Sequence, residues 1–117
     1  MKNPTNIYVM KCREFYKIGV SCRVEKRRYS ISSGLPFDVE LIANYKPNIK
    51  FYDRYDLRRA VGKIERFLHH TFASKRVKGE WFLLSDEELS SIPDLIKQAL
   101  LTKPNCIKEI PIEVRAK

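Results

Sequence analysis

The stretch NIYVMKCREFYKIGVS, residues 6–21, decides the fold prediction for this chain. It holds two short runs rich in apolar and aromatic residues, 7–10 and 15–20, with a short polar segment between them. Runs arranged in this way are typical of a β-hairpin. Because successive side chains on a strand point to opposite sides, Tyr16 and Lys17 are expected on opposite faces of a sheet.

The segments that follow predict two helices and a third strand. Ser21 is placed to cap a helix over residues 23–33, which Gly34 would end. The apolar run 39–45 predicts a third strand. Apolar residues at helical spacing then predict a longer helix over 53–72.

The C-terminal part is predicted to contain one more helix. A basic loop, 74–80, leads to a short strand or extended segment, 81–84. Ser85 and Glu88 have the spacing of a capping box, which would open the third helix. Pro93 lies inside this helical pattern and predicts a break or a restart there.

Together these elements predict an α+β fold of α/β sandwich type, with a small central three-stranded antiparallel sheet flanked by helices. Residues 5–101 are expected to form one domain, because a chain of 117 residues can bury one modest core. Residues 102–117 are expected to be a C-terminal tail or a docked extension.

The composition, 44% hydrophobic and 32% charged, is that of a globular domain. No apolar run approaches the roughly 20 residues of a membrane-spanning helix, and the first residues lack the pattern of a secretory signal. We therefore expect no membrane segment and an intracellular, cytoplasmic location. The three cysteines form no CxxC pair, which argues against a disulfide framework and a structural zinc site.

Positive charge is concentrated toward the N-terminus. The 23 Lys and Arg residues exceed the 14 Asp and Glu residues, which gives a net charge of +9. The net charge is +6 over residues 1–34 (eight basic, two acidic), +4 over 35–84 (ten and six) and −1 over 85–117 (five and six). Such an excess points to an anionic polymer as partner; a general solubility charge is the alternative.

Four sequence features stand in the order and spacing of a known family. They are Asn6-Ile7-Tyr8, Lys17-Ile18-Gly19, Arg27 and Glu65. With them the chain resembles the GIY-YIG nuclease superfamily. It is most similar to the branch of meiotically up-regulated gene 113-like domains found in phages and bacteria. The residues that carry this closer similarity are Glu65-Arg-Phe-Leu-His69, Phe72, Arg76 and Gly79-Glu80-Trp81-Phe82, and the resemblance covers about residues 6–84.

The chain departs from the family pattern at several positions. Asn6 stands where the first tripeptide has glycine, and Lys17 stands where the second has tyrosine. Tyr16 lies one position before that tyrosine, so it is expected on the opposite face. The asparagine that the family carries after the glutamate helix has no clear counterpart near Gly79.

The resemblance implies a metal-dependent DNA endonuclease that hydrolyses phosphodiester bonds, and the branch leaves a phage origin open. It implies that Glu65 binds one divalent ion, Mg²⁺ or Mn²⁺, that Arg27 holds the scissile phosphate, and that Tyr8 orients or deprotonates the water. The residue types suit these roles, because a carboxylate is a hard ligand and a guanidinium matches the geometry of phosphate.

Two further residues complete this candidate site. A tyrosine pKa near about 10 is too high for a base at neutral pH, so Tyr8 would need a nearby cation such as Lys17 or the metal. His69 lies one helical turn beyond Glu65, on the same face, where it would act as a general base or position the water.

Other basic side chains are candidate phosphate contacts. They are Lys26 and Arg28 in the first predicted helix, Arg54, Arg58, Arg59 and Lys63 in the second, and Lys75, Arg76 and Lys78 in the basic loop. DNA binding through these groups predicts strong salt dependence and little base discrimination. The alternative is a solvated helix face and loop.

Other functions stay open on sequence alone. The altered tripeptides also fit a catalytically weak or inactive member that binds DNA, or a phage-type protein that acts by binding another protein. Glu65 and His69 would then be a pair on a helix surface. Glu80 and Trp81 would anchor their segment to the sheet, and Glu80 is a lesser candidate for the site.

Double-strand cutting by one active site would imply a homodimer or two visits. No Gly-rich phosphate loop or nucleophile motif supports a small-molecule enzyme.

Overall fold

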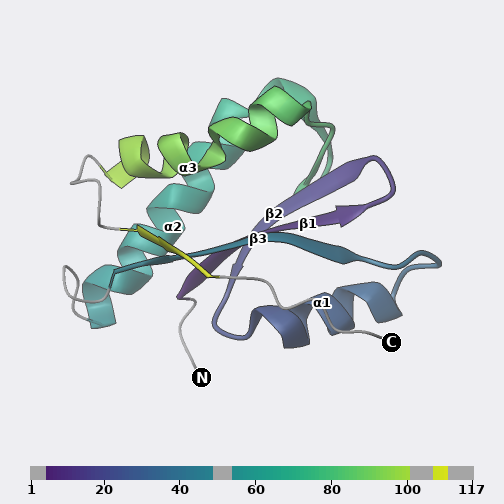
Figure 1. Ribbon diagram of the computed structural model, residues 1–117, viewed down its shortest axis with the longest axis horizontal. Helices are drawn as coiled ribbons and strands as arrows, with labels where there is room; N and C mark the ends of the chain where they lie inside the picture. The colour runs from purple at the N-terminus through teal and green to yellow at the C-terminus, as the bar shows by residue number, and fades with distance from the viewer. Residues whose placement is uncertain (1–4, 49–53, 101–106, 111–117) are drawn as a thin grey trace.

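An antiparallel sheet of six strands forms the middle layer of the computed structural model, which describes residues 5–48, 54–100 and 107–110 (Figure 1). Its strand order is β4-β5-β2-β1-β3-β6. The strands are β1 (Asn6–Cys12), β2 (Phe15–Ser21), β3 (Glu40–Pro47), β4 (Arg76–Lys78), β5 (Trp81–Phe82) and β6 (Ile107–Glu109). The α+β class is confirmed. The expected three-stranded sheet is wrong in extent, because short strands widen it at both edges.

The predicted hairpin lies at the centre of this sheet. β1 pairs with β2 from Asn6 opposite Ser21 to Cys12 opposite Phe15, and its other edge pairs with β3. Arg13 in the tight turn has a φ of 58°, which is the left-handed conformation that short hairpin turns require. Because β1 is hydrogen-bonded along both edges, the facing of its side chains is fixed.

Two of the added strands come from segments expected to be loop or tail. β4, from the basic loop, pairs with β5 around a turn in which Gly79 has a φ of 57°, where a side chain would be strained. β5 confirms the short strand expected near Trp81, and it pairs with β2 at Tyr16 and Lys17. At the opposite edge β6 pairs with β3. Within the expected tail or extension, 102–117, the structure thus describes one strand of the sheet, and residues 102–106 and 111–117 lie outside the described residues.

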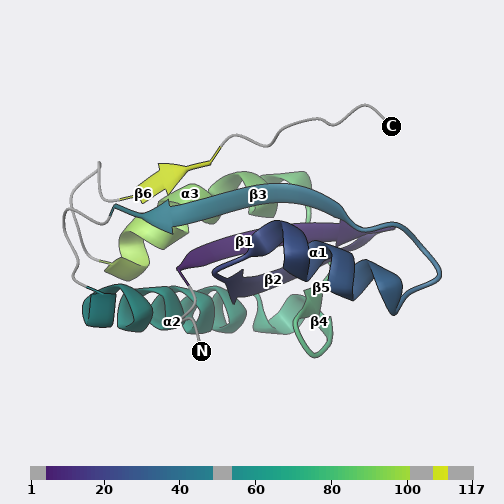
Figure 2. The same cartoon turned by 90° about the horizontal axis from the view of Figure 1, so that it is seen from below.

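Helices cover both faces of the sheet. Within the described residues, α1 (Val24–Ser33) lies on one face, and α2 (Arg54–Thr71) and α3 (Asp86–Leu100) lie on the other (Figures 1 and 2). The capping box of α3 is confirmed: Ser85 Oγ accepts a hydrogen bond from the Glu88 N–H at 3.1 Å, and Glu88 Oε1 accepts one from the Ser85 N–H at 3.0 Å. None of the helices in these ranges has the length and apolar character needed to cross a membrane.

The expected break of the third helix is wrong, because α3 runs through Pro93 without interruption. Proline inside a helix costs about 3 kcal/mol. Ile92 and Ile96, on either side of it, are buried to 1% and 0% exposure. Each such side chain contributes roughly 1.5–3 kcal/mol when it leaves water, so their burial offsets the cost of the proline.

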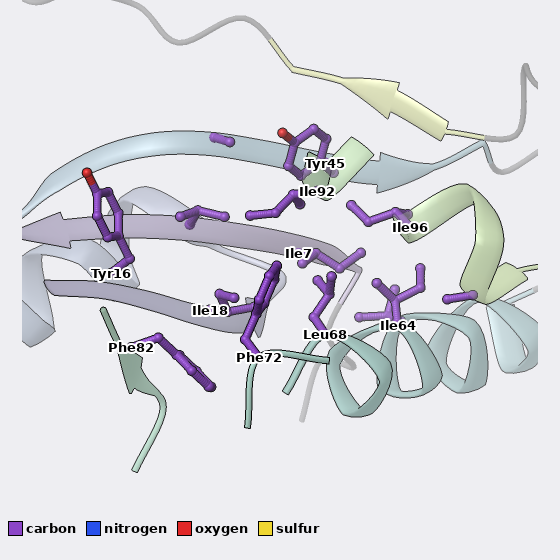
Figure 3. Packing of buried hydrophobic residues seen from close by; sticks show 14 of the residues in the cluster. Ile7, Tyr16, Ile18, Tyr45, Ile64, Leu68, Phe72, Phe82, Ile92 and Ile96 are labelled. Carbon is purple, nitrogen blue, oxygen red and sulfur yellow. The ribbon is translucent and has the colours of Figure 1, made fainter. Parts of the chain in front are cut away.

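The two faces of the sheet bury different residues. Toward α2 and α3 the core includes Ile7, Tyr16, Ile18, Ile64, Leu68, Phe72, Phe82, Ile92 and Ile96 (Figure 3). Toward α1 it includes Tyr8, Met10, Cys12, Val24 and Val39. Tyr16 and Tyr8 therefore point to opposite faces, as the alternation along the strands predicted.

Candidate active site

Tyr8 lies over a glycine on the neighbouring strand. Tyr8 on β1 is paired with Gly19 on β2, and only 1% of Tyr8 is exposed. A Cβ atom built on Gly19 would lie 2.6 Å from Tyr8 Cζ and closer still to the hydroxyl oxygen. The space beside the glycine is thus already filled by the phenol ring. Because Gly19 of the second tripeptide has no side chain, the Tyr8 ring can lie against β2. This contact sets the position of the Tyr8 hydroxyl.

The Tyr8 hydroxyl is partnered by α1, which packs on the same face. Arg27 forms a side-chain hydrogen bond with it, in which the guanidinium donates to the phenol oxygen. Burial raises the pKa of Tyr8, and the charges of Glu80 and Glu65 add to this rise, while the hydrogen bond and charge of Arg27 oppose it. The net direction is upward, so the neutral phenol is the favoured form of Tyr8 in the metal-free protein.

Lys17 does not supply the cation that the sequence pattern suggested for Tyr8. Its ammonium group lies 3.0 Å from Glu80 Oε1 and 5.5 Å from the ring centre of Trp81. The Lys17 side chain is only 11% exposed. A buried lysine needs a partner of opposite charge, and Glu80 is that partner. The cation that contacts the Tyr8 hydroxyl is Arg27.

One residue of β2, Ile18, contacts both Glu80 and helix α2. The Ile18 N–H donates to the Glu80 carbonyl oxygen at 3.2 Å, and His69 Nε2 lies 2.8 Å from the Ile18 carbonyl oxygen. β5 ends its pairing with β2 at Lys17, so these backbone groups of Ile18 lie just beyond the paired part of β2. Both groups are satisfied by residues of the site, as buried backbone groups require. Ile18 thereby fixes the spacing of His69 and Glu80.

The contact with Ile18 also determines the tautomer of His69. A carbonyl oxygen only accepts, so Nε2 carries the proton in this contact, and in the neutral imidazole Nδ1 is the nitrogen with the free lone pair. The ring of His69 packs against Phe82, with 5.2 Å between ring centres. A histidine that donates one ring N–H to a backbone carbonyl and leaves the lone pair of the other nitrogen for a ligand is oriented as metal-binding histidines usually are.

Glu65, His69 and Glu80 form a cluster of ligand-type side chains. One donor atom from each of them lies within 4.8 Å of the others. Burial raises the pKa of Glu65, the charge and hydrogen bond of Glu80 raise it further, and His69 and Arg66 lower it. Two carboxyl groups that share a hydrogen bond compete for one proton. A divalent cation would remove this conflict, and two carboxylates with one imidazole are suitable ligands for Mn²⁺ or Mg²⁺.

The two halves of the site are close enough to interact electrostatically. Glu65 and Glu80 both contribute to the pKa of Tyr8, although α1 and α2 lie on opposite faces of the sheet (Figure 2). Two neighbouring residues of β2 link the two halves: Ile18 contacts Glu80 and His69, and Gly19 lies against Tyr8. From the sequence, Glu80 is only a lesser candidate for the site, indicated by its place beside Trp81 in the family motif. In the structure it contacts both Lys17 and Glu65.

The remaining predicted contacts are spread over three places. Lys26 is exposed on α1, Arg58, Arg59 and Lys63 are exposed on α2, and Lys75, Arg76 and Lys78 are exposed in and beside β4. Arg54 lies in α2, but its side chain is outside the described residues. These groups remain candidate phosphate contacts, although Lys75 also lies 4.0 Å from Glu88.

Arg28 is engaged within the protein instead. Its Nη1 donates to the Val39 carbonyl oxygen at 3.1 Å, and its Nε donates to Glu25 Oε2 at 3.1 Å. These bonds fasten α1 to the segment just before β3. A structural role therefore accounts for Arg28, whereas the neighbouring Arg27 contacts Tyr8.

The fold and this site define a class: an α+β domain with a tyrosine–arginine pair near a glutamate from the helix on the other face of the sheet, as in GIY-YIG-like domains. A family model for the T5orf172 domain matches residues 5–97. The chain belongs to the T5orf172 domain family, which is GIY-YIG-like and nuclease-associated. Searches of the curated proteins and of the solved structures find no match to the chain.

Proposed function

We propose that this protein is a metal-dependent DNA endonuclease. The observation that supports it most is the convergence of the Tyr8–Arg27 pair with the cluster of Glu65, His69 and Glu80 around Ile18 and Gly19 of β2. Family membership supports a nuclease-like or DNA-binding role. The net charge of +9 suits a polyanionic substrate.

The chain's own residues would divide the work as follows. Glu65, His69 through Nδ1, and Glu80 would hold one divalent ion. Bound there, the ion would supply Lewis acidity toward the phosphate and lower the pKa of water. Lys17 holds the Glu80 carboxylate in place at 3.0 Å, which keeps a ligand with an otherwise mobile side chain aimed at the cluster.

Arg27 and Tyr8 would act on the phosphate. Arg27 carries a fixed fork of donors that matches phosphate oxygens, and it is exposed, whereas the ring of Tyr8 is buried. Tyr8 would orient the attacking water by its neutral hydroxyl, the form that its raised pKa favours at physiological pH. Of the two roles expected for Tyr8, the direction of this pKa favours positioning over proton abstraction.

DNA binding without efficient cleavage is the second candidate function. It is favoured by one observation, namely that Lys17 replaces the second tyrosine and pairs its charge with Glu80. In that case the Lys17–Glu80 ion pair would stabilise the sheet edge, and the exposed Lys and Arg side chains of α1, α2 and β4 would bind the DNA.

Cleavage by the wild type decides between these candidates, and Arg27→Ala tests the site. We expect the pure protein to nick supercoiled plasmid in Mn²⁺ or Mg²⁺ but not in EDTA. Removing a charged donor from the phosphate typically lowers the rate by about 10²- to 10³-fold, so Arg27→Ala is expected to lower nicking by that amount. Lys26→Ala is the matched control, because it removes a neighbouring exposed cation of α1.

Each outcome of this assay has a definite meaning. Equal losses for the Arg27 and Lys26 variants would show that Arg27 contributes only general charge. Absence of nicking by the wild type in either metal, with DNA binding retained, would favour the binding-only function.

A further inference from the structure

A hollow of about 270 Å³ lies on the same face of the sheet as Tyr8. It is lined by the tip of the β1–β2 hairpin, by the segment 35–37 that follows α1, and by the β4–β5 hairpin. These segments are distant in sequence, and all three contribute to the lining of one hollow. We call this hollow the aromatic pocket, after Phe15, Phe37 and Trp81, which line it together with Cys12.

Apolar side chains in the aromatic pocket are left in contact with water. Among the described residues, five large hydrophobic side chains are exposed, and Leu35, Phe37 and Val77 of this set line the pocket. Phe37 is 45% exposed and Val77 is 51% exposed. Gathered exposed apolar groups with a polar rim mark a binding surface rather than a packing defect.

Cations stand at the rim of the aromatic pocket. The Arg13 guanidinium lies 4.5 Å from the ring centre of Phe37, and Lys78 joins the lining from β4. The described residues that line the pocket include no acidic side chain. An aromatic floor with a cationic rim is complementary to a planar base that carries phosphates, because the base stacks while the phosphates face the charges.

The aromatic pocket also adjoins the candidate active site. Trp81 forms part of its wall and lies 5.5 Å from the Lys17 ammonium, which binds Glu80. Cys12 follows Tyr8 on β1 by four residues, roughly 13 Å at the rise of a strand. A strand whose phosphate contacts Arg27 can therefore place a nearby base in the pocket.

We infer that the aromatic pocket holds one unpaired nucleobase of the substrate, and that the preferred substrate is DNA with an unpaired strand beside the cleaved phosphate. The volume is slightly below that of ordinary small-molecule pockets, roughly 300 Å³ and upward, which suits one ring system. A base inside a duplex is stacked and paired, so it cannot enter unless it is first extruded. This inference rests on the proposed function and deepens it by naming the substrate class.

The test measures binding in EDTA, where no metal-dependent cleavage occurs. The probes are a short fluorescein-labelled single strand, the same strand with abasic residues, and the corresponding duplex. Phe37→Ala removes one stacking face, so we expect affinity for the normal single strand to fall on the order of tenfold. Affinities for the abasic strand and for the duplex should not change. Tyr29→Ala, at another aromatic residue that is 74% exposed, is the control.

The opposite results would overturn the inference. Equal losses on the normal and abasic strands would mean that Phe37 acts without a base. Unchanged binding of every probe would mean that the pocket does not take DNA, and would leave a protein partner as its occupant. Nicking in Mn²⁺ by the wild type is scored separately: nicking without any binding preference for the normal single strand would refute only the pocket, and that preference without nicking would refute only the endonuclease.

Discussion

Glu65→Gln is expected to abolish metal-dependent nicking while raising the melting temperature of the metal-free protein. The loss follows because an amide cannot supply the charge that a divalent ion needs, and a bound ion stabilises such reactions by several kcal/mol. Since each 1.36 kcal/mol is about tenfold in rate, the decrease should reach at least about 10³-fold. The measurements are plasmid nicking in Mn²⁺ and thermal unfolding in EDTA.

The gain in stability follows from the pKa of Glu65, which is raised above its ordinary value of 4.5 by burial and by Glu80. A carboxyl group with a raised pKa stabilises the fold least when it is ionised, so its contribution is lost as the pH rises through the folded-state pKa. The amide that replaces the carboxyl group can donate to Glu80 without ionising. The variant should therefore be more stable at neutral pH, and the difference should vanish below pH 4.5.

Metal addition provides the reciprocal measurement. Mn²⁺ at about one hundred times its Kd should stabilise the wild type by about 2.7 kcal/mol, and it should have little effect on the Glu65→Gln variant. Asp94→Asn, the same type of change at an exposed position of α3, is the control and should alter neither property. Equal stabilisation of wild type and variant by Mn²⁺ would place the ion elsewhere.

Gly19→Ala is expected to damage both stability and activity. The new methyl group would overlap the Tyr8 ring, with 2.6 Å between Cβ and Cζ, and β1 is held by strands on both sides. Overpacking of this kind costs about 1–3 kcal/mol, or roughly 5–15 °C in Tm for a domain of this size. The displaced hydroxyl should also lose its contact with Arg27, so nicking should fall more than DNA binding.

Gly34→Ala is the matched control for this change. A Cβ atom there meets only the Ile31 carbonyl oxygen at 3.7 Å, and its φ of −92° suits any residue. We expect urea denaturation to give a stability within about 0.5 kcal/mol of the wild type. If Gly19→Ala were equally harmless, Tyr8 would have to move freely, and its proposed positioning role would be wrong.

Local patterns in the sequence determined the hairpin, the three helices and the separation of Tyr8 from Tyr16. Alternation along a strand sets which side chains share a face, and the Ser85–Glu88 capping box acts within one helical turn. The residue types Tyr8, Arg27 and Glu65 could be proposed because their spacing matches that of a known family. Pro93 shows where local rules failed, because the burial that keeps α3 continuous comes from the sheet and α2.

Contacts between distant segments were decided only by the tertiary structure. His69 and Ile18 are 51 residues apart, and Glu80 reaches Ile18 from the turn after β4, a strand that the basic loop pattern did not predict. Lys17 pairs with Glu80 rather than Tyr8 because the pairing of β5 with β2 brings the Glu80 carboxylate next to it. Neither spacing nor composition encodes such meetings. They arise because the backbone N–H and carbonyl of Ile18 need hydrogen-bond partners. Glu80 and His69 provide these partners, and their side chains form part of the site.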